Sequence, residues 1–107
     1  MVVRRFEIWV VSLDPAVGSE MQKPRPAVVV SPDEMNNRLN TVLVAPLTKR
    51  GFVAPFRVPC QFGGINGQIA LDHIRSVDKR RLKRQLGQLD PATAKTVLDT
   101  LRELFEE

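Results

Sequence analysis

The sequence is poor in the residues that cross-link many small proteins. Cys60 is the single cysteine among 107 residues, so no disulfide can form within the chain. His73 is the single histidine, and no spacing of cysteine and histidine resembles a zinc motif. A chain of this length can bury roughly two thirds of its unfolded surface, so it can fold without such links.

Long apolar runs are also missing. No stretch approaches the roughly 20 residues of a transmembrane helix, and the opening MVVRRFE lacks the apolar segment of a secretory signal. Apolar residues make up 43% and charged residues 26%, a mixture that favours a globular chain over a disordered one. We therefore expect one domain over residues 1–107, soluble and cytoplasmic.

The familiar catalytic motifs are absent from the sequence as well. FGGING, residues 62–67, lacks the lysine and the strand-to-helix context of a phosphate-binding P-loop. No nucleophile elbow and no acidic metal cluster is present. Any catalysis is therefore expected to work without a bound metal, and we expect no cofactor.

Positive charge is in excess and unevenly placed. The formal net charge is +4, and the stretch 78–84, DKRRLKR, holds five cations. Further basic pairs are Arg4 with Arg5 and Lys49 with Arg50. A basic surface attracts polyanions such as nucleic acids through counterion release. Each cluster alone is also compatible with an ordinary solvated face.

Short β-forming runs separated by proline and glycine predict a mainly β fold. The glycine-rich stretch 62–68 is expected to form a hairpin-type turn, and residues 76–81 a helical turn. Five or six short strands with turns between them indicate a small, strongly curved antiparallel barrel. The predicted strands cover residues 6–13, 27–31, 41–48, 56–60, 68–74 and 82–89.

Start signals predict two helices. Ser31 can cap a short helix, with Pro32 in the first turn and Glu34 completing a capping box. Asp90 can cap the final helix, and Pro91 suits its first position. Apolar residues recur along this helix at helical spacing, so one face is expected to pack on the sheet or on a partner subunit.

The stretch KPRPAVVVS, residues 23–31, places Arg25 between two prolines just before a predicted strand. Pro26 pushes the backbone of Arg25 toward extended geometry, so ordering the arginine loses little entropy. A planar guanidinium suits two phosphate oxygens at once. Arg25 therefore either binds a phosphate or, as a structural residue, bonds loop carbonyls or pairs with Glu20. The preceding loop, residues 14–26, is long enough to suggest a functional role.

Three further polar residues are candidates for chemistry. Thr48 ends a predicted strand, where its hydroxyl either donates to a developing oxyanion or serves in a turn. Asp72 and His73 are neighbours in a predicted strand, so their side chains are expected to point to opposite faces and not to form an acid–base pair. His73 is then either a structural residue or a functional one.

Four segments together resemble the MazF/PemK toxin family of bacterial toxin–antitoxin systems. They are EIWVVSLDPAVGSE, RPAVVVSPDEMNN, VAPLT and IALDHIRSVDKRRL, and they span about residues 5 to 84. The resemblance implies an SH3-like barrel with a C-terminal helix that forms a homodimer. It also implies a sequence-specific, metal-independent endoribonuclease that cuts single-stranded RNA such as mRNA and is inhibited by a cognate antitoxin.

The resemblance also assigns residues. The catalytic arginine of the family falls on Arg25, its catalytic threonine on Thr48, and the acidic residue of its GSE segment on Glu20. The residues expected to contact RNA are Ser19, Lys49, Arg50, Asp72, His73 and Arg5.

Two positions depart from the family pattern. His73 stands where relatives usually carry glutamine, so RNA contacts there are expected to differ. One subgroup uses an arginine and an aspartate on the later strand; the aspartate falls on Asp72, but Ala70 occupies the place of the arginine. The chain therefore resembles the subgroup that uses arginine and threonine.

The implied reaction is attack of the RNA 2′-hydroxyl on the adjacent phosphate, which leaves a 2′,3′-cyclic phosphate and a 5′-hydroxyl. Arg25 suits the cation that stabilises the phosphorane, and Thr48 suits the oxyanion donor. Arginine is seldom deprotonated in proteins, so the base stays open. Glu20, His73 and solvent are the candidates.

Two other functions stay open on the sequence. One is a toxin of the same fold that poisons DNA gyrase without nuclease activity, although the terminal LRELFEE shows no matching end for that target. The other is a non-catalytic nucleic-acid-binding barrel. Such a barrel is expected to expose stacking aromatics, and this sequence has no tyrosine and one tryptophan.

Overall fold

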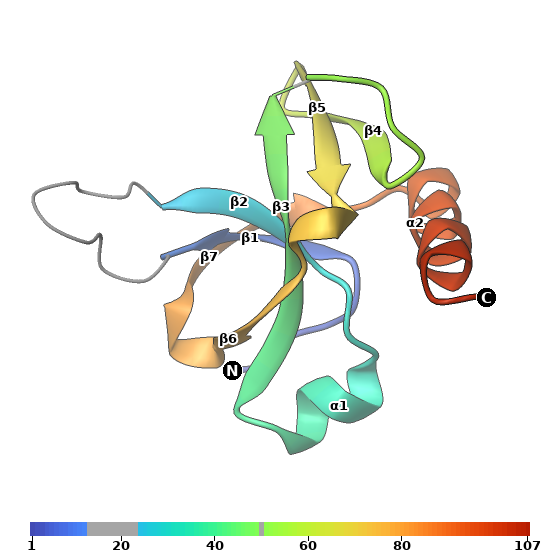
Figure 1. Cartoon of the computed structure of the whole chain (residues 1–107). Helices are drawn as coiled ribbons and strands as arrows, with labels where there is room; N and C mark the ends of the chain where they lie inside the picture. Colours follow the sequence, from blue (N-terminus) through green and yellow to red (C-terminus); the bar gives the residue numbers. More distant parts are fainter. Residues whose placement is uncertain (13–23, 50) are drawn as a thin grey trace, which may run out of the picture.

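The computed structural model describes residues 1–12, 24–49 and 51–107. Within these ranges the chain forms seven β-strands, two α-helices and two short 3-10 helices (Figure 1). The strands are β1 (Glu7–Val11), β2 (Arg25–Val29), β3 (Thr41–Lys49), β4 (Arg57–Phe62), β5 (Ile65–Ala70), β6 (Arg75–Asp78) and β7 (Leu82–Gln88). The helices are α1 (Asp33–Arg38), α2 (Pro91–Leu104), η1 (Leu71–His73) and η2 (Lys79–Arg81).

The strands pair antiparallel in the order β4-β5-β3-β2-β1-β7, and β6 pairs with β3 off this path. The long strand β3 is shared by both halves of the sheet. Its first residues, Thr41 to Val44, pair with β6, and its last, Leu47 to Lys49, pair with β5. Figure 1 shows β4 and β5 standing at an angle to β1, β2 and β7. No pairing joins β4 to β7 within the described ranges, so the curved sheet stays open there.

The expected class, mainly β with a C-terminal helix, is confirmed. Strand β6 is the element that the sequence pattern missed: of the helical turn expected over 76–81, only Lys79–Arg81 is helical, as η2, and the residues before it belong to β6. The predicted strand 68–74 ends early, at Ala70, where η1 begins. The predicted turn 62–68 was too long. Only Gly63 and Gly64 form the turn, with φ of 60° and 77°, and such left-handed pairs make two-residue hairpins.

Side-chain alternation along β2 explains why its sequence is apolar throughout. Val28 and Val30 join the core cluster beneath α2, which includes Val97. Ala27 and Val29 join a second cluster on the opposite face. Both faces of β2 are therefore covered from Ala27 onward, as expected for a central strand, whereas Arg25 at its start is exposed.

The helices agree with their predicted positions, but one cap differs. At α2, the carboxylate of Asp90 accepts from the Thr93 amide at 3.0 Å, as predicted. At α1, the Ser31 hydroxyl instead donates to Asn36 Oδ1 at 2.5 Å and accepts from the Leu43 amide, so it ties the helix to β3. Neither helix of the described ranges has the length and apolar character to cross a membrane.

Candidate functional site

Arg25 and Thr48 line the same two pockets from neighbouring strands. Arg25 is the first residue of β2 and Thr48 the penultimate residue of β3. Pocket A, about 260 Å³, is lined by both, by Pro26, and also by Val11, Ala27, Val44, Pro46, His73 and Arg75. Pocket B, about 500 Å³, is lined by the same three and also by Leu47, Lys49, Cys60, Phe62 and Gly67. Arg25 and Thr48 therefore stand at the junction of two adjacent hollows.

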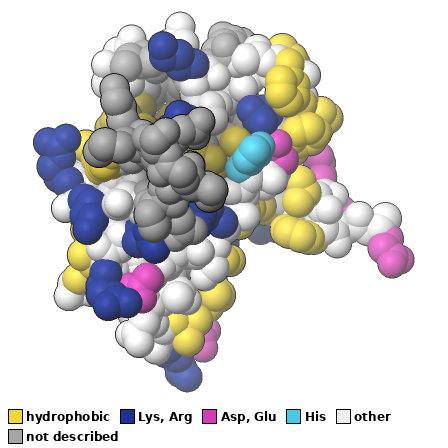
Figure 2. All heavy atoms as spheres, turned by 60° about the vertical axis from the view of Figure 1, so that its left-hand side comes forward, with side chains coloured by type: hydrophobic (Ala, Val, Ile, Leu, Met, Phe, Trp, Pro, Cys, Tyr) yellow, Lys and Arg dark blue, Asp and Glu magenta, His cyan; other side chains and the backbone are white. Residues whose placement is uncertain are grey.

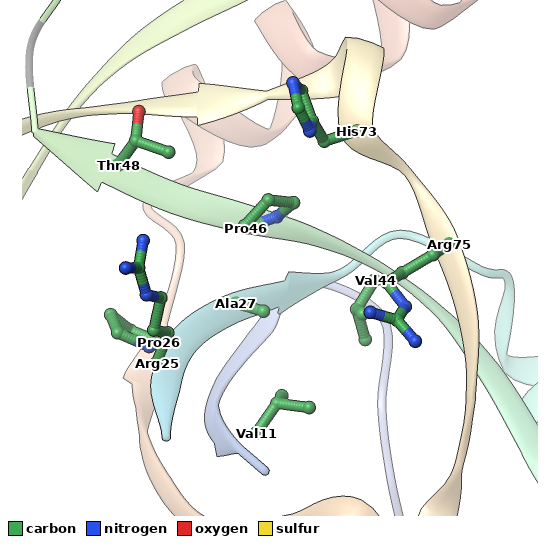
Figure 3. A pocket seen from close by; sticks show the side chains of 9 residues that line it. All are labelled: Val11, Arg25, Pro26, Ala27, Val44, Pro46, Thr48, His73 and Arg75. Carbon is green, nitrogen blue, oxygen red and sulfur yellow. The ribbon is translucent and has the colours of Figure 1, made fainter. Parts of the chain in front are cut away.

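The side chains in pocket A form two polar ends joined by an apolar floor (Figure 3). At one end the guanidinium of Arg25 points toward Thr48. At the other end lie His73 and Arg75. Pro46 lies between Thr48 and His73 along the edge of the pocket. A ligand in this pocket can thus meet a guanidinium at one end and an imidazole at the other, while the Thr48 oxygen points away from Arg25 in the view of Figure 3.

The fold explains why Arg25 faces outward. Its backbone pairs with Val11 of β1, and Pro26 pairs with Val10, so the extended geometry expected beside the proline is confirmed. The Arg25 side chain is exposed. Its charge is therefore presented to the pockets from a rigid strand end.

The Thr48 hydroxyl is not used by the fold. Its Oγ1 is buried and has no hydrogen-bond partner among the described residues. A buried hydroxyl without a partner is unfavourable by about 1–3 kcal/mol, so such groups are uncommon and often functional. Within the described ranges this hydroxyl is therefore a hydrogen-bond donor that the fold leaves unused.

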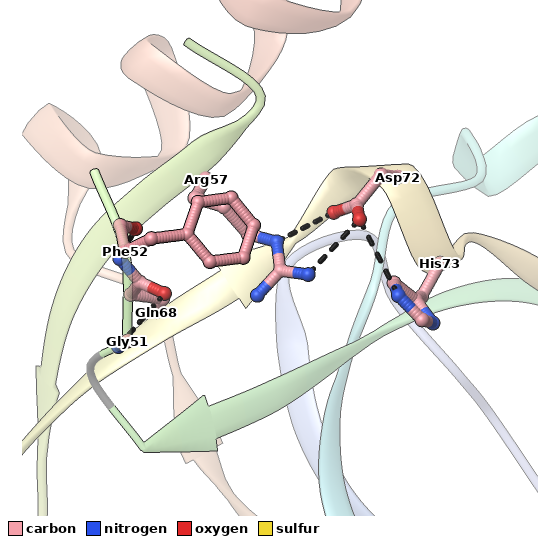
Figure 4. Close-up of polar contacts among 6 residues, drawn as sticks. All are labelled: Gly51, Phe52, Arg57, Gln68, Asp72 and His73. Carbon is pink, nitrogen blue, oxygen red and sulfur yellow. Dashed lines mark hydrogen bonds and ion pairs between the residues drawn. The ribbon is translucent and has the colours of Figure 1, made fainter. Parts of the chain in front are cut away.

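Asp72 connects His73 to a partly buried arginine (Figure 4). Arg57 donates from Nε and Nη2 to the two Asp72 oxygens at 2.6 and 2.9 Å. His73 Nε2 lies 3.3 Å from Asp72 Oδ2. The expectation that Asp72 and His73 point to opposite faces was wrong, because both lie in the 3-10 helix η1, where side chains do not alternate as in a strand.

Arg57 also packs its guanidinium against the ring of Phe52. Its Cζ lies 4.7 Å from the centre of the Phe52 ring, and its side chain is 11% exposed. Gln68, buried in β5, donates to the Phe52 carbonyl at 2.8 Å and accepts from the Gly51 amide at 3.2 Å. Hydrogen bonding from Arg57 lowers the pKa of the Asp72 carboxyl below its usual range. Asp72 is thus a fixed carboxylate.

Residues 4–105 match the PemK-like, MazF-like toxin family of type II toxin–antitoxin systems. The chain belongs to this family. Endoribonuclease MazF9 of Mycobacterium tuberculosis is 40% identical over 101 aligned residues, covering 85% of this chain and 86% of the relative. Endoribonuclease PemK of Escherichia coli is 34% identical over 105 residues, covering 92% and 79%. The MazE-MazF crystal structure (Form-II) from Deinococcus radiodurans matches with a TM-score of 0.83 at 28% identity, covering 97% and 96%.

Of the other site residues expected of a MazF/PemK toxin, Lys49 lines a pocket and Arg5 does not. Lys49 is exposed and lines pocket B. Arg5 lies away from both pockets, since its Nε donates to the Val30 carbonyl and its guanidinium lies over the Phe6 ring. Ser19, Glu20 and Arg50, which the resemblance also assigns to the site, lie outside the described residues.

Arg57, Arg75 and Phe62 are site residues that the sequence patterns of this toxin chain did not reveal. Arg57 opposes Ala70 in the register of β4 and β5, which explains how it reaches Asp72 in the following turn. Arg75 and Phe62 line pockets A and B, respectively. Arg57 and Phe62 fall within a predicted strand and a predicted turn, and Arg75 falls between two predicted elements, so no local pattern marks them; Arg75 and Phe62 line the pockets, and Arg57 reaches them only through Asp72 and His73.

The face around the site is basic. Figure 2 shows lysine and arginine side chains at several points of this face, with His73 next to an acidic side chain. Arg25, Lys49 and Arg75 are the cations that line the two pockets in the described part of the toxin. Their charge suits a polyanionic ligand such as a nucleic acid.

Proposed function

We propose that this chain is the toxin of a type II toxin–antitoxin pair and acts as a sequence-specific endoribonuclease on single-stranded RNA. Its relatives of 40% and 34% identity are named endoribonucleases. The observation that carries the proposal is that both pockets are lined by Arg25 and by Thr48, whose hydroxyl has no hydrogen-bond partner among the described residues. The active form is a homodimer in the cytoplasm, held inactive by a cognate antitoxin.

In this mechanism the scissile phosphate lies between Arg25 and Thr48. The guanidinium neutralises the charge that develops on the phosphorane, and the hydroxyl donates to a non-bridging oxygen. Donors aimed at developing charge are each worth on the order of 3 kcal/mol in the barrier. Because both groups come from rigid strands, they need little reorganisation when the reaction occurs. Glu20 belongs to the same proposed catalytic set.

The two pockets give the RNA strand a path past this phosphate. One neighbouring nucleotide enters pocket A and the other enters pocket B, where Phe62 offers a ring for stacking and Lys49 a cation. Holding nucleotides on both sides splays the backbone and favours an in-line attack on the phosphate. The shapes of the pockets would then contribute to the choice of RNA motif.

Purified protein is expected to cut a long defined RNA in the presence of EDTA. None of the proposed roles needs a metal, so chelation should not slow the reaction. The cut ends should be a 2′,3′-cyclic phosphate and a 5′-hydroxyl, read by end-specific labelling. Binding of RNA without cutting would contradict the proposal, and so would trapping of DNA gyrase in its place.

RNA and antitoxin are expected to compete for the toxin. An antitoxin with an acidic tail would lie across the basic face that carries Arg25, so one ligand excludes the other. The measurement uses a labelled RNA with a 2′-deoxy nucleotide at the cut site, which binds without reacting. Adding the antitoxin should release this RNA. A stable ternary complex of toxin, antitoxin and RNA would show that the two ligands bind elsewhere.

A further inference from the structure

We propose that His73 accepts the proton of the RNA 2′-hydroxyl, held in position by Arg57 through Asp72. This inference rests on the proposed nuclease function and selects His73 from the candidate bases Glu20, His73 and solvent. A guanidinium has donors and no acceptor, so Arg25 serves as a cation and donor. Thr48 is a neutral donor in the same mechanism.

His73 is the one side chain of pocket A, among the described residues, that carries a nitrogen lone pair able to accept a proton. The rest of the lining is apolar, or consists of Arg25, Arg75 and Thr48. Pocket B adds no base, since burial raises the pKa of the Cys60 thiol. The side chain of His73 is 63% exposed, so a ribose can reach it.

The contacts of Asp72 define which nitrogen of His73 is available. Asp72 is a carboxylate, because hydrogen bonding from Arg57 lowers its pKa. The nearer imidazole nitrogen, Nε2, lies 3.3 Å from Oδ2, a contact with a carboxylate that favours a hydrogen on Nε2 over one on Nδ1. Nδ1 is left as the acceptor. A carboxylate that holds an imidazole in one tautomer is a common device of general-base catalysis.

Contacts from residues distant in the sequence hold Asp72 in place beside His73. Arg57 binds Asp72 with two parallel hydrogen bonds, the most directional form of such a pair. Phe52 covers the guanidinium, and Gln68 fixes the Phe52 backbone. Arg57 of β4 thus binds the Asp72 carboxylate directly, Phe52 and Gln68 support Arg57, and the carboxylate also contacts His73 (Figure 4).

The charged groups that face His73 suit a base beside a phosphate. Asp72 contacts the ring from its own element, and Arg57 of β4 lies behind Asp72. Arg75 of β6 and Arg25 of β2 line the same pocket. The cations attract the phosphate, and Asp72 stabilises the imidazolium that forms when the proton arrives.

The chemical step balances as follows. Nδ1 of His73 takes the 2′-hydroxyl proton while the 2′-oxygen forms a bond to phosphorus. The bond from phosphorus to the 5′-oxygen breaks, and that oxygen takes a proton from water. His73 then returns its proton to solvent. The nucleotide that supplies the 2′-hydroxyl, on the 5′ side of the cut, therefore occupies pocket A, and the next nucleotide occupies pocket B.

Replacing His73 by glutamine is expected to lower kcat/KM for RNA cleavage about 100-fold, the lower end for a lost general base. For the wild type, kcat/KM should fall with unit slope on the acid side, where the imidazole is protonated. The His73→Gln variant should lose this limb. Added imidazole should restore part of the rate to His73→Ala, because a free base can occupy the space that the side chain leaves.

The positioning role has a readout that does not depend on cleavage. His73 is the single histidine, so its ring nitrogens give unambiguous NMR signals. In the folded protein they should show the tautomer with hydrogen on Nε2. Asp72→Asn and Arg57→Lys should mix the tautomers and lower kcat with little change in KM. Asp99→Asn, which removes a carboxylate paired on α2, is the matched control and should change neither.

The outcomes separate the two proposals. If the wild type cuts RNA and His73→Gln keeps both its rate and its acid limb, the base is another group and the inference fails while the nuclease function stands. A hydrogen on Nδ1 in the folded wild type also overturns it. A wild type that cuts no RNA removes the nuclease function, and the role of His73 with it.

Discussion

Replacing Arg25 by alanine is expected to lower the rate of RNA cleavage by about 100- to 1,000-fold while the protein stays folded. The loss is large because the guanidinium contacts the phosphate at the point where charge develops in the transition state. The fold should be unaffected, since the side chain is exposed and the strand pairing of Arg25 uses its backbone. Single-turnover cleavage of a defined RNA measures the rate, and circular dichroism checks the fold.

Two companion variants identify the cause of the loss. Arg25→Lys keeps the charge but not the planar fork, so its rate should fall between those of the wild type and Arg25→Ala. Arg38→Ala removes an exposed arginine on α1, a helix that lines neither pocket. Nη2 of Arg38 lies 3.9 Å from Oε1 of Glu34. It should cut RNA at the wild-type rate. Near-normal cleavage by Arg25→Ala would exclude the guanidinium from the mechanism.

The positions of most elements follow from local sequence signals. The apolar run after Arg25 predicts β2 because a strand covered on both faces needs apolar residues throughout. Asp90 and Pro91 predict the start of α2 because a helix leaves its first amides unpaired and a carboxylate can accept from them. Local signals failed at residues 71–78, where a 3-10 turn between two short strands leaves no periodic pattern.

The site could be predicted only in part. The prolines beside Arg25 and the strand end at Thr48 are local features, and the structure brings both residues to the same pockets. The contact of Arg57 with Asp72 spans 15 positions and depends on the register of a hairpin, which two glycines set. His73 was judged from strand alternation. Its contact with Asp72 could not be predicted in this way, because Asp72 and His73 lie in η1 and not in a strand.

Gly67 of β5 lies against the backbone of Thr48, so a substitution at this glycine should affect both the stability of the fold and the site. A Cβ added at this glycine would lie 2.7 Å from the backbone oxygen of Thr48 and 3.8 Å from that of Cys60. The first distance is shorter than real Cβ contacts allow, and a backbone atom in a sheet cannot move aside alone. A side chain at Gly67 must therefore push β5 away from β3 beside Thr48.

Replacing Gly67 by alanine is accordingly expected to destabilise the fold by about 1–3 kcal/mol, as overpacking does. It should also slow RNA cleavage by up to about 100-fold, because a displacement near 1 Å at a reacting group has effects of that size. Urea unfolding and cleavage at saturating RNA measure the two effects. Gly51→Ala is the matched control, because its added Cβ would lie 3.8 Å from Gln68 Oε1, an ordinary contact.

A double variant shows whether the loss of activity passes through Thr48. Thr48→Val removes the hydroxyl, so a displacement of Thr48 has nothing further to disturb. Gly67→Ala and Thr48→Val should then be strongly non-additive in the cleavage rate, although each slows the reaction alone. Their effects on the unfolding free energy should add more nearly. Fully additive losses in rate would mean that Gly67 acts through pocket B and not through the hydroxyl that β3 presents to the phosphate.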